Sequence, residues 1–345
     1  MFTFSVIALL FTLLVVPIST SQLPTPLLVT YWGQGSRLTQ KPLRSYCDLG
    51  YNVVVLGFVD KFGNETLHVE MDTADCSTKN TSGCNAIASD ITYCQNRNVK
   101  VLMSMGGATV HDCARHGCPG EYRFDSADEA NNTAEQMYHM FFAGKKNNSY
   151  WRPFGDVQLD GVDLDIEETS VETPEGYQAY QWHYDEFIAK LRELQGQKDL
   201  IVSAAPECHH GCLSNCNPLE QAVNLTKFDY LFVQFYNDPG CSLLKPDFDS
   251  SLNYWLNLRG PSSMTKIVLG VPGDIDETDP TYFVPPENVV SIYSEKHKHN
   301  NRVDGIGIWQ ASSNTTDPNF FRIIREGLGL HADIKALSDQ PSPTT

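Results

Sequence analysis

Eight short apolar runs, rich in Val, Ile, Leu and Phe, recur along the chain with polar segments between them. They occupy residues 27–32, 52–59, 100–105, 161–166, 200–204, 230–235, 266–271 and 305–309. Segments with helical periodicity or charge pairing separate them, for example 85–97, 127–143, 176–194 and 318–328. In 176–194, apolar residues from Tyr184 to Leu194 recur at spacings of three or four, which is typical of one helix face. Continuous apolar strands that alternate with helices predict a parallel sheet buried on both faces.

Eight such units predict a single-domain α/β protein with the (β/α)8 TIM-barrel fold, whose active site lies at the C-terminal ends of the strands. The competing architecture is a doubly wound open sheet, which normally carries a Gly-rich phosphate turn after its first strand. Residues 32–36, Trp-Gly-Gln-Gly-Ser, match that turn only in part, and no acidic ribose partner follows on the next strand. We therefore favour the barrel.

The fourth apolar run carries three acidic residues on one face. In the stretch 160–167, the alternation of a β-strand turns Asp163, Asp165 and Glu167 to one side and the intervening aliphatic residues to the other. Like charges about 6 Å apart repel by roughly 3 kcal/mol at an effective dielectric of about 20. Such repulsion keeps at least one carboxyl protonated near neutral pH, which is what a general acid requires. A solvated acidic edge strand or a calcium site fits less well, since calcium loops place Gly and Asn in turns rather than alternating Val, Leu and Ile.

Other strand ends carry residues that would meet these carboxylates in a barrel. Gly106 and Gly107 end the third run, where small residues let the backbone approach a ligand or a neighbouring strand. Gln234 and Tyr236 share the inward face of the sixth run, although a buried Tyr can equally be satisfied by hydrogen bonds within the core. Trp309 ends the eighth run and offers either a flat surface for a sugar ring or a core side chain.

The first residues resemble a secretory signal. Residues 6–16 are apolar apart from Thr12, and Pro17 and small residues at 19–21 follow. This is the hydrophobic core and cleavage region of a signal peptide, and it is too short to span a membrane. We expect a signal peptide over residues 1–21, the (β/α)8 catalytic domain over 22–335 and a polar C-terminal tail over 336–345. A secreted, extracellular protein without a membrane anchor follows from this division.

Composition agrees with export. The net charge of −17 argues against a nucleic-acid partner, whereas a neutral or cationic polymer remains compatible. Ten cysteines favour disulfides over metal binding, although the Cys-His-rich stretch 208–212 would also suit zinc. Six Asn-X-Ser/Thr sequons predict glycosylated surface loops; they begin at Asn64, Asn80, Asn131, Asn147, Asn224 and Asn314.

Taken together, these motifs resemble glycoside hydrolase family 18. The stretch 160–167 is similar to its catalytic signature, and 104–107 to its second motif. Further segments are similar to the class III, hevamine-like chitinases of plants and fungi; they are 31–34, 61–64, 204–206, 228–237 and 284–286. The resemblance runs in order from about residue 27 to residue 325 and covers nearly the whole chain after the signal.

The resemblance implies a mechanism in which the substrate's own 2-acetamido group attacks, an exception to the usual two-carboxylate scheme. Glu167 would be the general acid and then the base for water. Asp165 would hold the acetamide N–H, Tyr236 would donate to the acetamide oxygen, and Asp163 would share a proton with Asp165. The candidate substrate-binding residues are Tyr31, Gly106, Gly107, Gln234, Asn237 and Trp309.

The resemblance also implies covalent and backbone details. It suggests the disulfides Cys47–Cys94, Cys76–Cys84 and Cys208–Cys241, which leaves Cys113–Cys118 and Cys212–Cys216 as short local pairs. It further suggests cis peptide bonds at Gly57–Phe58 and Trp309–Gln310. Asn64 matches a position that lines the cleft, so we expect this sequon to be unmodified or its glycan to tilt away. A longer, cysteine-bearing loop at 111–123 would narrow one end of the cleft.

The sequence therefore predicts a monomeric endo-chitinase that acts on chitin or N-acetylglucosamine oligomers with no metal and no organic cofactor. The alternative is a chitin-binding lectin or a glycosidase inhibitor on the same barrel. Such relatives lose members of the catalytic set, whereas Asp163, Asp165, Glu167 and Tyr236 are all present here.

Overall fold

The computed structural model describes residues 23, 25–35, 38–63, 67–71, 76–78, 81–107, 124–144, 150–167, 182–196, 199–210 and 219–330. Several expectations fall outside these residues. They are the signal peptide, the C-terminal tail, the loop 111–123, the pairs Cys113–Cys118 and Cys212–Cys216, and the sequons at Asn64, Asn80 and Asn147. In the part that is described, no helix combines the length and apolar character needed to cross a membrane.

Eight parallel strands close into a barrel, as the apolar runs predict. They are β1 (Leu27–Trp32), β2 (Val53–Lys61), β5 (Lys100–Gly106), β6 (Gly161–Asp165), β7 (Ile201–Ala204), β8 (Tyr230–Gln234), β9 (Lys266–Pro272) and β10 (Val303–Trp309). Each strand pairs with the next along the chain, and β1 pairs with both β10 and β2, which closes the ring. The TIM-barrel prediction is confirmed.

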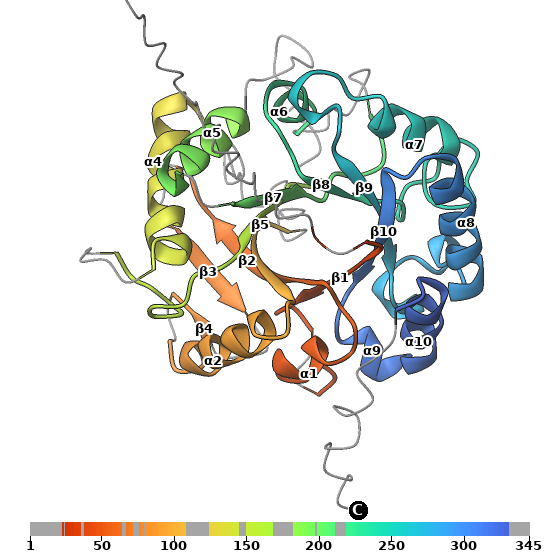
Figure 1. Ribbon diagram of the computed structural model, residues 1–345, viewed down its shortest axis with the longest axis horizontal. Helices are drawn as coiled ribbons and strands as arrows, with labels where there is room; N and C mark the ends of the chain where they lie inside the picture. Colours follow the sequence, from red (N-terminus) through yellow and green to blue (C-terminus); the bar gives the residue numbers. More distant parts are fainter. Residues whose placement is uncertain are drawn as a thin grey trace, which may run out of the picture.

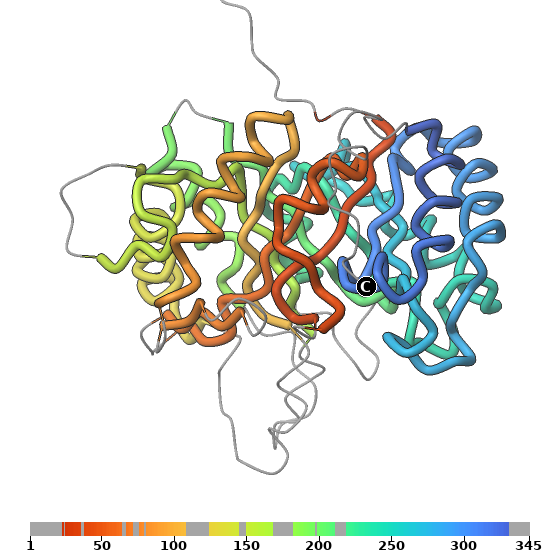
Figure 2. Tube along the Cα trace, turned by 90° about the horizontal axis from the view of Figure 1, so that it is seen from below, coloured from red at the N-terminus to blue at the C-terminus, as the bar shows by residue number. Residues whose placement is uncertain are grey.

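Helices surround the strands on the outside of the ring (Figure 1). They are α1 (Arg44–Cys47), α2 (Cys84–Gln95), α4 (Ala127–Met137), α5 (Tyr184–Gln195), α6 (Glu220–Leu225), α7 (Phe248–Leu256), α8 (Pro286–His299), α9 (Ser313–Thr316) and α10 (Pro318–Gly327). Figure 2 shows the ring from the side, with α8 and α10 packed together as one flank. Three short 3₁₀ turns lie at Gly260–Ser262, Ile275–Glu277 and Pro280–Tyr282.

The four predicted helical segments are present, with shifted ends. The segment 127–143 consists of α4 and a π-helical turn, Tyr138–Phe142, rather than one regular helix. The segment 176–194 is helical only from Tyr184, and its first residues are not among those described. The hairpin of β3 (His68–Met71) and β4 (Cys76–Ser77) was not predicted, because strands of four and two residues leave no measurable alternation.

The barrel separates two buried layers. Inside it lies a cluster that includes Leu27, Val29, Val55 and Phe232, while the alternate residues of the same strands face the helices in a larger outer core. Both faces of each strand are therefore buried, which is why the strands read as continuous apolar runs. The inner layer ends near the strand tips, and polar residues replace it there.

Three disulfides and two cis peptide bonds match the expectations. The disulfides join Cys47 to Cys94, Cys76 to Cys84 and Cys208 to Cys241. Since the sulfur of Cys208 is bonded to Cys241, it is not a thiolate ligand for zinc. The peptide bonds Gly57–Phe58 and Trp309–Gln310 are both cis.

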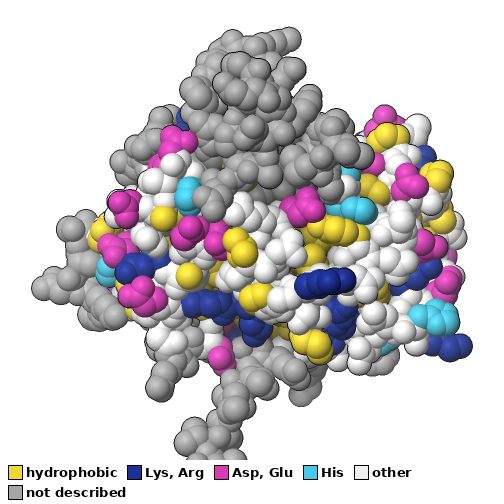
Figure 3. Space-filling view, turned by 90° about the horizontal axis from the view of Figure 1, so that it is seen from above, with side chains coloured by type: hydrophobic (Ala, Val, Ile, Leu, Met, Phe, Trp, Pro, Cys, Tyr) yellow, Lys and Arg dark blue, Asp and Glu magenta, His cyan; other side chains and the backbone are white. Residues whose placement is uncertain are grey.

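Three sequons lie in helices rather than in loops, which corrects that prediction. Asn131 lies in α4, Asn224 in α6 and Asn314 in α9. Asn224 is exposed, and the other two are half-buried. A sequon shows only that a site is polar, so it does not separate a loop from the outer face of a surface helix. On the coloured part of the face drawn in Figure 3, both acidic and basic side chains are present, and several Lys and Arg side chains gather near its centre.

Candidate active site

The three acidic residues of β6 form a ladder that rises along the inside of the barrel. Asp163 and Asp165 belong to the strand, and their exposed fractions are 0% and 2%. Glu167 follows two residues later and is half-buried at the C-terminal end of the barrel. Val162, Leu164 and Ile166 are buried in the outer core on the other face of the strand. The alternation predicted from the sequence thus places the carboxylates together and inward.

Asp163, the innermost of the three, is held by hydroxyl groups. Its Oδ2 accepts hydrogen bonds from Tyr31 at 3.0 Å and Ser104 at 2.8 Å, and its Oδ1 accepts one from Ser203 at 2.6 Å. Burial raises the pKa of Asp163, and the three hydroxyl donors oppose that rise because they stabilise the charged form. The hydroxyls therefore offset part of the cost of a negative charge in a dry interior.

Asp165 and Glu167 are joined by one amide. The Nε2 atom of Gln234 lies 3.0 Å from Asp165 Oδ1, 3.0 Å from Glu167 Oε1 and 3.0 Å from the carbonyl oxygen of Ala205. Burial raises the pKa of Asp165 well above its usual range, and the negative charges of Glu167 and Asp163 raise it further. Burial and repulsion therefore disfavour two negative charges in the upper part of the ladder.

A small pocket opens beside the ladder. Its polar and aromatic lining includes Tyr31, Asp165, Gln234, Tyr236 and Trp309. Trp309 packs against Tyr31, with ring centroids 5.5 Å apart, and Phe58 stacks on it at 6.2 Å. Burial, followed by the charges of Glu167 and Asp165, raises the pKa of Tyr236 well above its usual value. The phenol therefore stays a neutral hydrogen-bond donor at any ordinary pH.

Three predicted binding residues have structural tasks instead of lining this pocket. Gly106 has φ +109°, and a Cβ there would lie 2.0 Å from the carbonyl oxygen of Asp165. Gly107 donates its N–H to that same oxygen at 2.8 Å. The side-chain oxygen of Asn237 accepts from Thr278 at 2.6 Å and thereby ties together the loops that follow β8 and β9. These residues set the position of β6 and of the loops around it.

The sequence pattern did not predict two glutamates that lie at the site. Glu277 accepts hydrogen bonds from the amide of Gln310 at 3.2 Å and from Trp309, so it holds the indole ring at its edge. Glu207 follows β7 and contributes negative charge at Tyr236 and Asp165. The inward alternation of Ser203 and Ala205 could have revealed Glu207, whereas Glu277 lies on a 3₁₀ turn and has no such signal.

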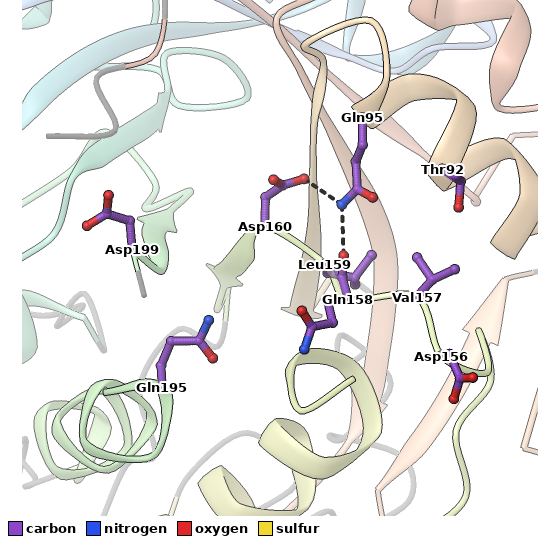
Figure 4. Close-up of a pocket in the computed structure, with 9 residues that line it drawn as sticks. All are labelled: Thr92, Gln95, Asp156, Val157, Gln158, Leu159, Asp160, Gln195 and Asp199. Carbon is purple, nitrogen blue, oxygen red and sulfur yellow. Dashed lines mark hydrogen bonds between the residues drawn. The ribbon is translucent and has the colours of Figure 1, made fainter. Parts of the chain in front are cut away.

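A second hollow lies at the opposite end of the barrel (Figure 4). Its most buried acid, Asp160, immediately precedes β6 and accepts hydrogen bonds from Lys100 at 3.0 Å and Gln95 at 2.9 Å. This carboxylate already has a cationic partner and a backbone donor at Val101, so it joins strands rather than reacting. Charge pairs at the N-terminal end of a TIM barrel contribute to stability, whereas the reactive groups lie at its C-terminal end.

Comparisons with known proteins show the family of this chain. A model of the glycosyl hydrolases of family 18 matches residues 27–276. An acidic endochitinase of Nicotiana tabacum is 30% identical over 283 residues, which cover 82% of this chain and 86% of that protein. Acidic endochitinase SE2 of Beta vulgaris is 31% identical over 286 residues, with coverage of 82% and 85%.

Solved structures include both an enzyme and an inhibitor. The ICChI chitinase of Ipomoea carnea has a TM-score of 0.69 at 26% identity and covers 87% of this chain and 99% of its own. The xylanase and alpha-amylase inhibitor protein XAIP-II of Scadoxus multiflorus has a TM-score of 0.70 at 26% identity, with coverage of 89% and 100%. Overall shape therefore does not separate catalysis from inhibition, and the site residues have to do so.

Proposed function

Because this chain belongs to the glycosyl hydrolases of family 18, we propose that it is a secreted endo-chitinase that cleaves β-1,4 links between N-acetylglucosamine units. The observation that carries the proposal is the inward ladder of Asp163, Asp165 and Glu167, with the upper two carboxyls held by the Gln234 amide. A binding protein has no need for three carboxyls stacked on one strand, since their repulsion costs stability.

In the proposed reaction, Glu167 protonates the glycosidic oxygen of the leaving sugar. The acetamide oxygen of the sugar on the other side of the cut attacks the anomeric carbon, and an oxazolinium ion forms as the glycosidic bond breaks. Glu167, now ionised, accepts a proton from the water that opens this ring. Two inversions at one carbon give products of retained, β configuration.

The other residues orient the acetamide group. Asp165 accepts a hydrogen bond from its N–H and stabilises the positive charge that develops on it, while the neutral phenol of Tyr236 donates to its oxygen. Asp163, held by three hydroxyls, supports Asp165 from below with its charge. This arrangement demands an N-acetylated sugar next to the cut, because a free amine offers no attacking oxygen.

The aromatic floor of the pocket suits a sugar ring. Trp309 lines the pocket beside Tyr31 and Gln234, and its indole ring is fixed by Phe58 on one side and by Glu277 at its edge. A flat apolar surface next to hydrogen-bonding groups matches the two faces of a pyranose ring. We propose that Trp309 forms the floor of the subsite next to the cut.

Export and oxidation fit the same function. The three disulfides agree with an oxidising compartment, and the signal-like residues 1–21 supply a route to it. We propose that the protein acts outside the cell as a monomer, where chitin is an extended and uncharged polymer. Some of the six sequons would then carry glycans.

The test is hydrolysis of N-acetylglucosamine oligomers, with glucose oligomers of equal length and linkage as the matched control. We expect cleavage of the first only, with β-configured reducing ends detected by proton magnetic resonance before mutarotation. Binding of the N-acetylated oligomers without cleavage would support a lectin. Cleavage of both series, or α-configured products, would exclude acetamide participation.

A further inference from the structure

A polar hollow lies between α6 and α7, two neighbouring helices of the outer ring (Figure 1). It is lined by Asn224 of α6, by Asn253 and Tyr254 of α7, and by residues 257–259, which follow α7. Its volume of about 410 Å³ is within the range of clefts that hold small ligands. Because the end of α6 leads into β8, the hollow lies near the N-terminal ends of the strands, away from the carboxylate ladder.

The wall of this hollow contains an atom to which a sugar is attached in secreted proteins. Asn224 begins the sequon 224–226, and it is exposed, whereas Asn131 and Asn314, the other sequon asparagines that the structure describes, are half-buried. Its Nδ2 atom, which would carry the glycan, donates to the carbonyl oxygen of Glu220 at 2.8 Å. A glycosylated amide keeps one of its two N–H groups, so this hydrogen bond persists and directs the first sugar.

The lining of the hollow matches N-acetylglucosamine, the innermost sugar of such a glycan. The amides of Asn253 and Asn257 and the guanidinium of Arg259 belong to exposed residues and supply hydrogen-bonding groups. Tyr254 adds an aromatic wall, since its ring stacks on His210 with the two centroids 4.0 Å apart. Polar groups beside an aromatic ring suit the hydroxyl edge and the apolar face of a pyranose.

Contacts between α6 and α7 hold the hollow in shape. The carboxylate of Glu220 accepts a hydrogen bond from the hydroxyl of Tyr254, and the carbonyl oxygen of Glu220 accepts the one from Asn224. The 3₁₀ turn after α7 lies against the chain that follows α6, where Ser262 donates to the carbonyl oxygen of Thr226 at 2.8 Å. The walls are thus in place before a sugar arrives, so little ordering of the protein opposes its binding.

We propose that Asn224 carries an N-linked glycan whose innermost N-acetylglucosamine lies in this hollow and joins α6 to α7. The inference rests on the secretion proposed above and selects one of the six sequons. Attachment joins Asn224 Nδ2 to the anomeric carbon of a lipid-diphosphate-linked oligosaccharide. The bond from that carbon to the diphosphate breaks, the lipid diphosphate leaves with its electron pair, and the amide loses one proton. A glycan at this end of the barrel leaves the catalytic pocket open.

The first test is occupancy, measured by mass spectrometry on peptides of the protein secreted from a eukaryotic host. A host secretion signal replaces residues 1–21, so the result does not depend on export by the signal of this chain. We expect the peptide that contains Asn224 to carry a glycan, and the corresponding peptide of Asn224→Gln to carry none. A wild-type protein in which Asn224 is bare would overturn the proposal.

The second test is the rate at which a glycosidase that cuts the bond between Asn and sugar releases the glycan from folded protein. A sugar held in the hollow is shielded, so release at Asn224 should be several-fold faster in Asn253→Ala and Arg259→Ala than in the wild type. Asn288→Ala, at an exposed asparagine of α8, is the matched control and should release at the wild-type rate. Equal native rates in all of these proteins would show that the sugar lies outside the hollow.

A thermal cycle gives a readout that needs no glycosidase. Since Ala favours helix more than Asn does, Asn253→Ala should not lower the Tm of protein that lacks the glycan because of Asn224→Gln. With the glycan attached, the same change should lower the Tm by about 1–3 °C, because the sugar loses a partner. An equal shift in both backgrounds would contradict the seat. A glycosylated protein that cleaves no oligomer would contradict the proposed hydrolase instead, and leave the glycan site standing.

Discussion

Replacing Ser203 by Ala tests whether Asp163 carries the negative charge at the base of the ladder. The Ser203 hydroxyl donates to Asp163 Oδ1 at 2.6 Å, and both side chains are fully buried. A hydrogen bond to a charged group contributes about 1.5–3 kcal/mol, compared with about 1 kcal/mol for one between neutral groups. We therefore expect Ser203→Ala to lower the free energy of unfolding by about 1.5–3 kcal/mol at neutral pH.

The pH dependence of this loss follows from the pKa of Asp163. Burial already raises the pKa of Asp163 in the folded state. The folded wild type therefore binds this proton more tightly than the unfolded chain does, and its free energy of unfolding rises as the pH falls through the folded-state pKa. Removing a hydroxyl that stabilises the charged form raises the pKa further. The variant therefore regains part of its deficit in acid, where Asp163 is protonated in both proteins and the lost bond is worth only about 1 kcal/mol.

The assay is urea unfolding of both proteins at neutral pH and again in mild acid, with disulfides intact. Ser251→Ala is the control, because its buried hydroxyl donates to the neutral carbonyl oxygen of Cys208. The control should lose the same amount at both pH values. If Ser203→Ala behaved like the control, Asp163 would be neutral at pH 7 and the charge would lie elsewhere in the ladder.

Three further changes have distinct expected outcomes. Gly106→Ala places a Cβ against the carbonyl oxygen of Asp165 at a backbone φ of +109°, so thermal unfolding should show a loss of at least about 2 kcal/mol in the free energy of unfolding. The control Gly155→Ala, whose Cβ would meet no neighbour, should lose about 1 kcal/mol. Equal losses in the two variants would refute the close approach at Gly106. Trp309→Ala should reduce kcat/KM on oligomers by about 10- to 100-fold through lost ring contact, and an unchanged value would remove it from the subsite. Replacing both Cys47 and Cys94 by Ser should lower the free energy of unfolding by about 3–4 kcal/mol, because their disulfide closes a loop of 47 residues. A loss below about 1 kcal/mol in denaturant unfolding would contradict this expectation.

The barrel could be predicted because each of its strands is apolar on both faces. Such runs stand out against polar surroundings whatever lies between them, as β2 and β9 illustrate. The short hairpin after β2 and the π-helical turn after α4 could not be predicted in the same way. They depend on register and on hydrogen bonds between residues that the local pattern does not specify.

The site could be predicted where chemistry followed the alternation of a strand. Asp163, Asp165 and Gln234 are brought together because each lies on an inward position of a strand. Asn237, expected to bind substrate, does not line the small pocket; its backbone is left-handed, with φ +58°, and its side chain contacts the loop after β9. Residues beyond the strand tips are oriented by loop contacts, and the sequence pattern does not record these.

The central claim is that Glu167 gives a proton to the leaving sugar, and Glu167→Gln tests it most directly. An amide has nearly the same shape but no proton to give, so the variant should still bind N-acetylglucosamine oligomers while kcat falls by about two orders of magnitude or more. The control Glu193→Gln, which changes a glutamate that is 70% exposed on α5, should cleave at the wild-type rate. If Glu167→Gln cleaved these oligomers within a few-fold of the wild-type rate, the acid would be another group and the proposed mechanism would be wrong.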